Sequence, residues 1–389
     1  MKRLKCGKNL TSSFLLASAF LMQMLTGIVG IAVPIYAAEL GASPLLLGFI
    51  GAAGGLIYSF MPLASGVLSD RFRKKIFVFT STLLYSLSCL LYSIMGDPYM
   101  LIPVKALEWI SVALFWPSVE ALLVEASEVN VEETLRRFNL SWGSATIVGP
   151  MIGGSLISVL GVKTPFTTSS VISLTLALLA IIMVEERLKS KHIAESKTSA
   201  STGNHNASIV DAIVEILLFS SIGGVIFNLF PAYAVSLGIP AYTVGLIMLI
   251  NGLFRLIAFL ETYKIEAKFS RRFVFLTGSL IMAFASALTA IGSTALIFAI
   301  AFAFFGFGAG MLYASSIATL LRDWGAKKGY ASGLFESLIG VGYFLGSLTG
   351  GFISEYAPNA PYILGLSISL IVCLFQVFYK NMKTQYHPP

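Results

Sequence analysis

Charged residues are scarce in this chain of 389 residues, and their scarcity excludes most classes of soluble protein. Asp, Glu, Lys and Arg make up 12% of the sequence, against about 25% in soluble domains. Hydrophobic residues make up 56%, and the mean hydropathy is +0.84. The chain is therefore solvated mainly by lipid.

Cysteine and histidine are also rare, with three residues of each. The cysteines have neither disulfide nor metal-ligand spacing, so we expect no metal site. The sequence contains no G-x-x-x-x-G-K-[ST] loop, which argues against an ATP-driven pump. We expect a protein that is not an enzyme and has no bound cofactor.

Apolar stretches about 20 residues long recur along the chain, and each is long enough to cross a hydrocarbon core as a helix. They are uniformly apolar rather than alternating, which favours helices over barrel strands. The predicted helices cover approximately 11–36, 44–68, 75–95, 99–124, 138–160, 164–184, 209–234, 242–262, 272–291, 294–321, 329–355 and 359–380. The fold class is therefore an all-α membrane protein with twelve transmembrane helices.

The two halves of the sequence match when one is shifted by 197 residues. The shift carries Pro34 onto Pro231 and Gly154 onto Gly351, together with many other glycines. Because glycine and proline are retained for backbone reasons, the halves are predicted to repeat one backbone. We expect a six-helix bundle over 1–184, a polar linker over 185–208 and a second bundle over 209–389.

The basic residues are distributed according to topology. If the N-terminus is cytoplasmic, 23 of the 26 Lys and Arg residues fall in cytoplasmic segments, which is the positive-inside rule. The net charge of +7 is thereby explained without a nucleic-acid partner. We expect a multi-pass protein of the cell membrane with both termini in the cytoplasm.

A glycine, an aspartate and a basic cluster lie between the second and third predicted helices. The segment contains Gly66, Asp70, Arg71, Arg73 and Lys74. It resembles the signature loop of the major facilitator superfamily, G-x-L-x-D-R-x-G-R-R/K, although arginine replaces the second glycine at position 73. The resemblance implies that these residues control the conformational change during transport.

An acid at the inner end of the fourth helix falls where this family commonly has a partner for the signature loop. The residue is Glu125, and its expected partner is Arg73 or Lys74. Glu120, about one turn deeper, is the alternative.

The fifth predicted helix carries Gly143, Gly149, Pro150, Gly153 and Gly154. The pattern resembles the helix-5 motif of the drug:proton antiporters of the superfamily, and we expect a role in gating. Small residues also allow close helix packing in any transporter, and this alternative stays open.

The resemblance covers the chain apart from its N-terminal tail and linker. It implies two six-helix bundles related by an axis along the membrane normal, which the superfamily exemplifies. It also implies a substrate site near the bilayer midplane and alternating access by rocking of the two halves.

Four charged residues within predicted helices are candidates for function, because charges there are costly and usually functional. Glu108 is about 13 Å deep at 1.5 Å per residue, and Lys105 is its i,i+3 neighbour. Arg255 and Glu336 lie at similar depths in the second half, which suggests mutual neutralisation. Each pair is a candidate for proton coupling or, alternatively, a structural ion pair.

In the superfamily, helices 1, 4, 7 and 10 line the central cavity. Polar and aromatic residues on or near these helices are the candidates for substrate contact: Gln23, Trp109, Trp116, Asn228, Tyr233, Asn251, Phe305 and Tyr313.

We therefore expect a secondary transporter, acting as a monomer, that exports small apolar or amphipathic compounds and is driven by a proton gradient. Its expected partners are the small-molecule substrate, protons and membrane lipid, with no nucleic acid. The alternatives are proton-coupled uptake of a sugar, amino acid or organic acid, and a transporter-like receptor.

Overall fold

The computed structural model describes residues 2–71, 73–126, 131–184, 205–323 and 328–386. All regular elements in these ranges are helices, and twelve of them are long and apolar enough to span a membrane. The elements of the first half are α1 (Lys2–Glu39), α2 (Pro44–Arg71), α3 (Lys74–Ile94), η1 (Pro98–Met100), α4 (Leu101–Ala126), α5 (Val131–Leu160) and α6 (Thr164–Met183). Those of the second half are α7 (His205–Asn228), α8 (Phe230–Ser236), α9 (Ala241–Lys268), α10 (Arg271–Ile291), α11 (Ala295–Asp323), α12 (Lys328–Ser354) and α13 (Ala360–Tyr386).

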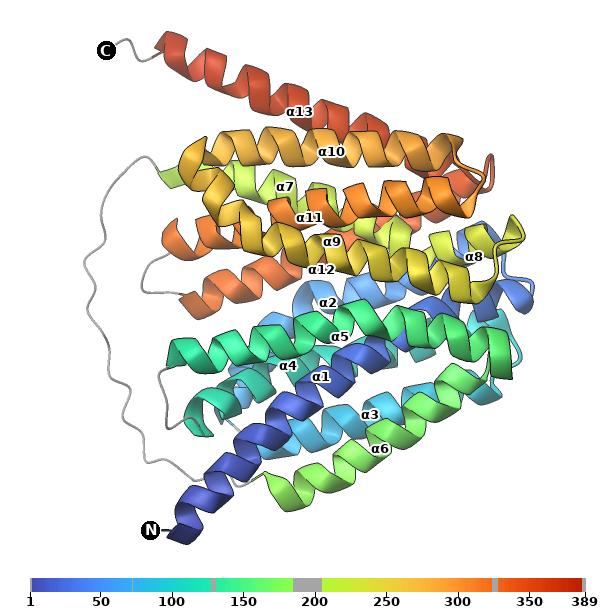
Figure 1. Cartoon of the computed structure of the whole chain (residues 1–389), viewed down its shortest axis with the longest axis vertical. Coiled ribbons are helices and arrows are strands. Elements are labelled where there is room, and N and C mark those ends of the chain that lie inside the picture. The colour runs from blue at the N-terminus through green and yellow to red at the C-terminus, as the bar shows by residue number, and fades with distance from the viewer. Residues whose placement is uncertain (1, 72, 127–130, 185–204, 324–327, 387–389) are drawn as a thin grey trace.

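The helices form two groups that follow the chain order, α1–α6 and α7–α13 (Figure 1). The halves meet along two helix pairs, α2 with α12 and α5 with α9. The first turn of α1 and the last turn of α13 lie on the same side of the molecule (Figure 1). We call this the termini side and the opposite one the far side.

The sequence repeat is visible in the helix bounds. The shift of 197 residues carries both ends of α2 onto the ends of α9, and both ends of α3 onto those of α10. The predicted all-α fold of twelve membrane-spanning helices is therefore confirmed.

One predicted helix is broken. The expected helix over 209–234 is interrupted at Leu229, where α7 ends and the short α8 begins. Pro231 lies in the first turn of α8 and has no backbone N–H to donate to the carbonyl of Phe227, so the helix loses a hydrogen bond there. The related Pro34 lies inside α1, which continues past it to Glu39.

Candidate functional site

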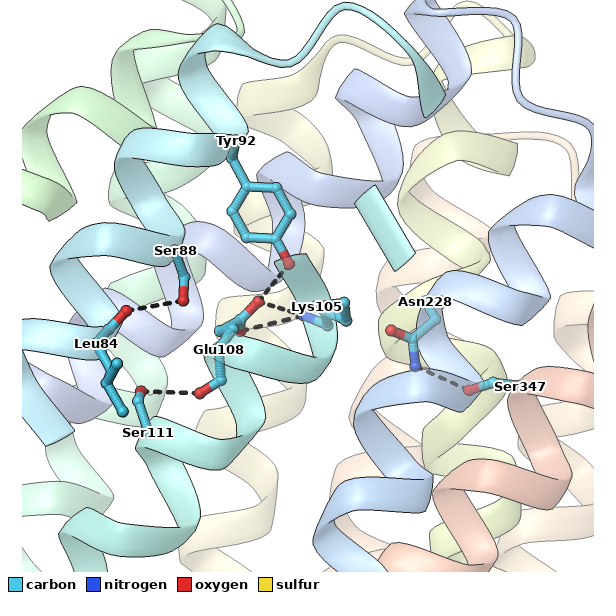
Figure 2. A network of polar contacts seen from close by, with 8 residues as sticks. All are labelled: Leu84, Ser88, Tyr92, Lys105, Glu108, Ser111, Asn228 and Ser347. Atoms are coloured by element: carbon cyan, nitrogen blue, oxygen red, sulfur yellow. Dashed lines mark hydrogen bonds and ion pairs between the residues drawn. The ribbon is translucent and has the colours of Figure 1, made fainter. Parts of the chain in front are cut away.

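A buried ion pair lies on α4 of the first half, beside α3 (Figure 2). Lys105 Nζ lies 3.1 Å from Glu108 Oε1 and 3.0 Å from Oε2, as their spacing predicts. Tyr92 on α3 donates its hydroxyl to Glu108 Oε2 at 2.8 Å. The side chains of Lys105 and Glu108 are only 5% and 1% exposed. The pair is thus enclosed within the first half and has its hydrogen-bonding needs largely met there.

The expected neutralisation between Arg255 and Glu336 is wrong, because each group has another partner. Glu336 Oε2 on α12 accepts a hydrogen bond from the Tyr58 hydroxyl on α2 at 3.0 Å. Arg255 Nη2 on α9 lies 3.4 Å from Asn251 Oδ1, one helical turn earlier. The Arg255 guanidinium also lies 5.7 Å from the centre of the Phe227 ring. Helix rotation sets these contacts, and the depth of two residues does not reveal it.

The Tyr58–Glu336 hydrogen bond joins the two halves of the protein. Tyr58 belongs to α2 of the first half and Glu336 to α12 of the second. The length of this bond therefore depends on how the two halves are placed relative to each other.

Four aromatic side chains form a row across the same boundary, which we call the inter-half aromatic row: Tyr58, Trp109, Tyr343 and Phe227. The ring centres are 5.0 Å apart for Tyr58 and Trp109, 6.3 Å for Trp109 and Tyr343, and 6.2 Å for Tyr343 and Phe227. These distances are typical of interacting aromatic pairs. All four side chains keep some accessible surface. The row therefore offers aromatic surface from both halves.

Two other predicted cavity residues lie beside this row. Asn228, the last residue of α7, donates to the Gly224 carbonyl at 3.0 Å and to Ser347 Oγ at 2.9 Å (Figure 2). Asn251 donates to the Phe302 carbonyl at 3.1 Å, which directs its oxygen toward Arg255.

The remaining predicted cavity residues are dispersed. Trp116 packs against aromatic residues of the first half, including Trp142, and Tyr233 packs against Phe298 and Tyr362. Phe305 is almost fully buried against Phe302.

Tyr313 and Gln23 are each partly exposed. Tyr313 packs against Phe335 with ring centres 4.8 Å apart. Tyr313 and Tyr343 both interact electrostatically with Arg255 and with Glu336. Both tyrosines therefore lie near the two groups that the sequence analysis had paired.

The signature loop is described only in part. The side chains of Gly66, Asp70 and Arg71 lie outside the described residues. Arg73 is exposed and precedes the first turn of α3. Lys74 Nζ lies 3.0 Å from Glu125 Oε1, so the ion pair expected between the loop and the end of α4 is formed by Lys74.

The alternative acid on α4, Glu120, has a different environment. It is exposed, and it interacts electrostatically with Glu336 and Tyr313 of the second half. It therefore lies near the boundary between the two halves.

The glycines of α5 bring this helix close to two neighbours. A Cβ on Gly153 would lie 2.8 Å from the Ile28 carbonyl oxygen of α1. A Cβ on Gly154 would clash with the Ala241 carbonyl at the start of α9. Gly149 packs on α1, and the Pro150 carbonyl lies against Gly245 of α9. Gly143 has open space around its Cβ position. The motif therefore joins α5 to its own half and to the other half.

Two symmetry-related hydrogen bonds join the halves on the far side. The Leu45 N–H in the first turn of α2 donates to Glu355 Oε1 at 2.8 Å. The Tyr242 N–H in the first turn of α9 donates to Ser158 Oγ at 3.0 Å. The shift of 197 carries Leu45 onto Tyr242 and Ser158 onto Glu355. Each half thus caps a helix N-terminus of the other half.

Glu355 also binds the Ser43 side chain. Hydrogen bonds hold the pKa of the Glu355 carboxyl below its usual range. The bond from the Leu45 N–H has the larger effect and the bond from the Ser43 side chain the smaller one. Hydrogen bonds to the ionised form and the positive end of a helix dipole both favour the carboxylate.

Sequence reasoning missed a buried acid on α7. Glu215 is fully buried, and it accepts hydrogen bonds from Ser279 Oγ at 2.8 Å and from Gln376 Nε2 at 3.0 Å. It joins α7 to α10 and α13 within the second half. The signal was present, since Glu215 lies in the apolar run 209–234.

Comparison with known proteins identifies relatives along most of the chain. A family model described as Major Facilitator Superfamily matches residues 15–265 and 212–389. An uncharacterised MFS-type transporter of Methanocaldococcus jannaschii is 23% identical over 350 residues, which are 87% of this chain and 89% of the relative. The quinolone resistance protein NorA of Staphylococcus aureus is 22% identical over 374 residues, which are 94% of this chain and 95% of the relative.

Solved structures share the fold. The nucleoside transporter NupG superposes with a TM-score of 0.74 at 14% identity and covers 94% of this chain and 98% of its own. A POT family transporter in complex with a thioalcohol-conjugated peptide gives a TM-score of 0.76 at 12% identity, with 95% and 96% covered.

Proposed function

The chain belongs to the Major Facilitator Superfamily and is a membrane transporter, and from this premise we propose that it exports small apolar or amphipathic compounds in exchange for protons. The similarity to a quinolone resistance protein supports export of drug-like compounds. The bias of basic residues supports a cytoplasmic termini side. The proposed partners are the substrate, protons and lipid, and the proposed unit is a monomer.

The way in which the halves meet supports the proposal of alternating access. On the far side, the Leu45–Glu355 and Tyr242–Ser158 hydrogen bonds hold the halves together. With the proposed orientation, these bonds close the extracellular side. Rocking of one half against the other must break both bonds before the extracellular side can open.

The Tyr58–Glu336 hydrogen bond carries the proposal of proton coupling. Glu336 is an acid inside a membrane-spanning helix, and among the described residues it has no cation within ion-pair distance. Its ionised form is a stronger acceptor for the Tyr58 hydroxyl than its protonated form. Loss or gain of a proton therefore changes an interaction between the halves, which is what coupling requires.

Glu108 is the competing candidate for the coupling group. It is paired with Lys105 and enclosed within one half, so no movement of the halves needs to alter its surroundings. The geometry therefore favours Glu336 for coupling and a structural role for Glu108.

Flux measurements in proteoliposomes test the proposal. Compounds that raise the thermal stability of the purified protein are added to vesicles under an imposed pH gradient, and trapped pyranine reports proton movement. We expect compound-dependent proton flux in the wild type and in the control variant Glu261→Gln, which changes an exposed acid of α9. We expect no coupled flux in Glu336→Gln.

Two results would contradict the proposal. Substrate flux that does not depend on the imposed pH gradient would indicate uncoupled transport. Unchanged coupled flux in Glu336→Gln would remove Glu336 from the mechanism.

A further inference from the structure

Arg255 is a membrane-embedded cation without a counter-ion among the described residues. Arginine stays protonated in proteins, and charges inside membrane-spanning helices normally face an acid or water. Lys105 satisfies this rule through Glu108. Arg255 contacts the neutral side chains of Asn251 and Phe227 instead.

The hydrogen-bonding capacity of Arg255 is mostly unused. Its contact with Asn251 is long, at 3.4 Å, whereas charge-assisted bonds of this kind are about 2.7–2.9 Å. Its Nε is buried and has no hydrogen-bond partner in the described part of the chain. The guanidinium therefore retains donors for an acceptor that the described residues do not supply.

The nearby acids do not act as the counter-ion of Arg255. Glu336 is engaged by Tyr58, and no described carboxylate lies within ion-pair distance of Arg255. Glu120 interacts electrostatically with Glu336 and Tyr313 from the other half. An anion that pairs with Arg255 must therefore come from outside the described residues.

Aromatic surface adjoins the guanidinium. The Phe227 ring lies beside the Arg255 guanidinium and is stacked on the Tyr343 ring at an interplanar angle of 28°. Tyr343 in turn adjoins Trp109, whose indole Nε1–H is also buried without a partner in the described chain. A flat ring placed along this row would gain stacking contacts and bring an acceptor to the unpaired donors of Arg255.

From this juxtaposition we infer that the substrates are aromatic compounds bearing an anionic group, with the anion bound by Arg255 and the ring bound by Phe227, Tyr343 and Trp109. The planar guanidinium suits a carboxylate or sulfonate, which it can bind through two parallel hydrogen bonds. The inference rests on the proposed transport function and specifies the substrate class of the same site.

Three naphthalene probes of equal ring size test the inference: 2-naphthoate, 2-naphthylmethanol and 2-naphthylmethylammonium. Binding to the full-length purified protein is measured by calorimetry. We expect 2-naphthoate to bind most tightly, because only this probe supplies an anion to Arg255.

Variants of the site give the second arm of the test. Arg255→Gln should weaken 2-naphthoate binding about tenfold or more, which corresponds to one charge-assisted hydrogen bond, and should leave 2-naphthylmethanol binding unchanged. Arg255→Lys should bind 2-naphthoate with intermediate affinity, because lysine keeps the positive charge but cannot form the two parallel hydrogen bonds of the planar guanidinium. Lys264→Gln removes an exposed positive charge from the same helix and should have no effect.

Preferred binding of 2-naphthylmethylammonium would overturn the inference and point to Glu336 and Glu120 as the recognition groups. Equal binding of 2-naphthoate to wild type and Arg255→Gln, or binding of no probe, would also overturn it. If Arg255→Gln does not fold, Arg255→Lys decides the same question. Proton-coupled flux of other compounds that depends on Glu336 would leave the transport proposal intact in each case.

Discussion

Replacement of Lys105 and Glu108, singly and together, separates a structural ion pair from a proton pathway. Lys105→Met leaves the Glu108 carboxylate with Tyr92 as its remaining side-chain donor in the described structure, at 1% exposure. Glu108→Met leaves the Lys105 ammonium buried without its acid. In each single variant an uncompensated charge remains in the interior of the first half.

The expected magnitudes follow from burial. Removing one partner of a buried pair costs about 3–5 kcal/mol, whereas replacing both by apolar residues of similar volume is neutral or stabilising by about 1–4 kcal/mol. We therefore expect each single variant to lower the free energy of unfolding by about 3–5 kcal/mol. The double variant Lys105→Met/Glu108→Met should recover most of that loss, giving a coupling energy of several kcal/mol.

The assay combines equilibrium unfolding in detergent with pH-driven flux in proteoliposomes. The double variant should be folded and should retain gradient-driven flux within a few-fold of the wild type. A double variant that unfolds like the wild type but has lost its dependence on the pH gradient would refute this reasoning. Glu108 would then be the coupling acid.

Three further predictions concern the gating regions. Acidification through and below the ordinary carboxyl pKa of 4.5 should separate the far-side loops of the wild type. The pKa of Glu355 is depressed, so its carboxylate stabilises the closed far side above pH 4.5 and loses this contribution as the pH falls. In Glu355→Gln, distances between spin labels on the far side should not change over this pH range. Gly351→Ala places a methyl group 2.6 Å from the Cα of Gly48 and should disfavour far-side closure by about 1–3 kcal/mol, whereas Gly143→Ala has open space and should leave the same label distances unchanged. Asp70→Asn should reach the membrane in normal amounts but slow transport, and unchanged turnover would limit the signature loop to a role in topology.

The sequence predicted those features that depend on local order along the chain. Hydropathy and the internal repeat located the twelve spans, and the i,i+3 spacing predicted the Lys105–Glu108 pair. The family resemblance predicted that Glu125 pairs with Arg73 or Lys74 of the signature loop, and Lys74 forms the ion pair.

Features that depend on helix rotation could not be predicted from one sequence. Arg255 and Glu336 lie at similar depths but contact different residues. Depth alone does not specify which face of a helix packs against which neighbour. The break at Leu229 was missed because Pro231 has a counterpart, Pro34, inside a helix that continues.

The central claim is that the two halves rock against each other under control of Glu336. Double electron–electron resonance on a cysteine-free background tests it, with one label pair at Gly96→Cys and Ser293→Cys on the far side and another at Leu140→Cys and Lys264→Cys toward the termini side. Between about pH 8 and about pH 5.5, a range that brackets perturbed carboxyl titrations, we predict that the two distances change in opposite directions with one midpoint. Glu336→Gln should abolish both changes. Distances that change independently of each other, or that titrate normally in Glu336→Gln, would contradict the account.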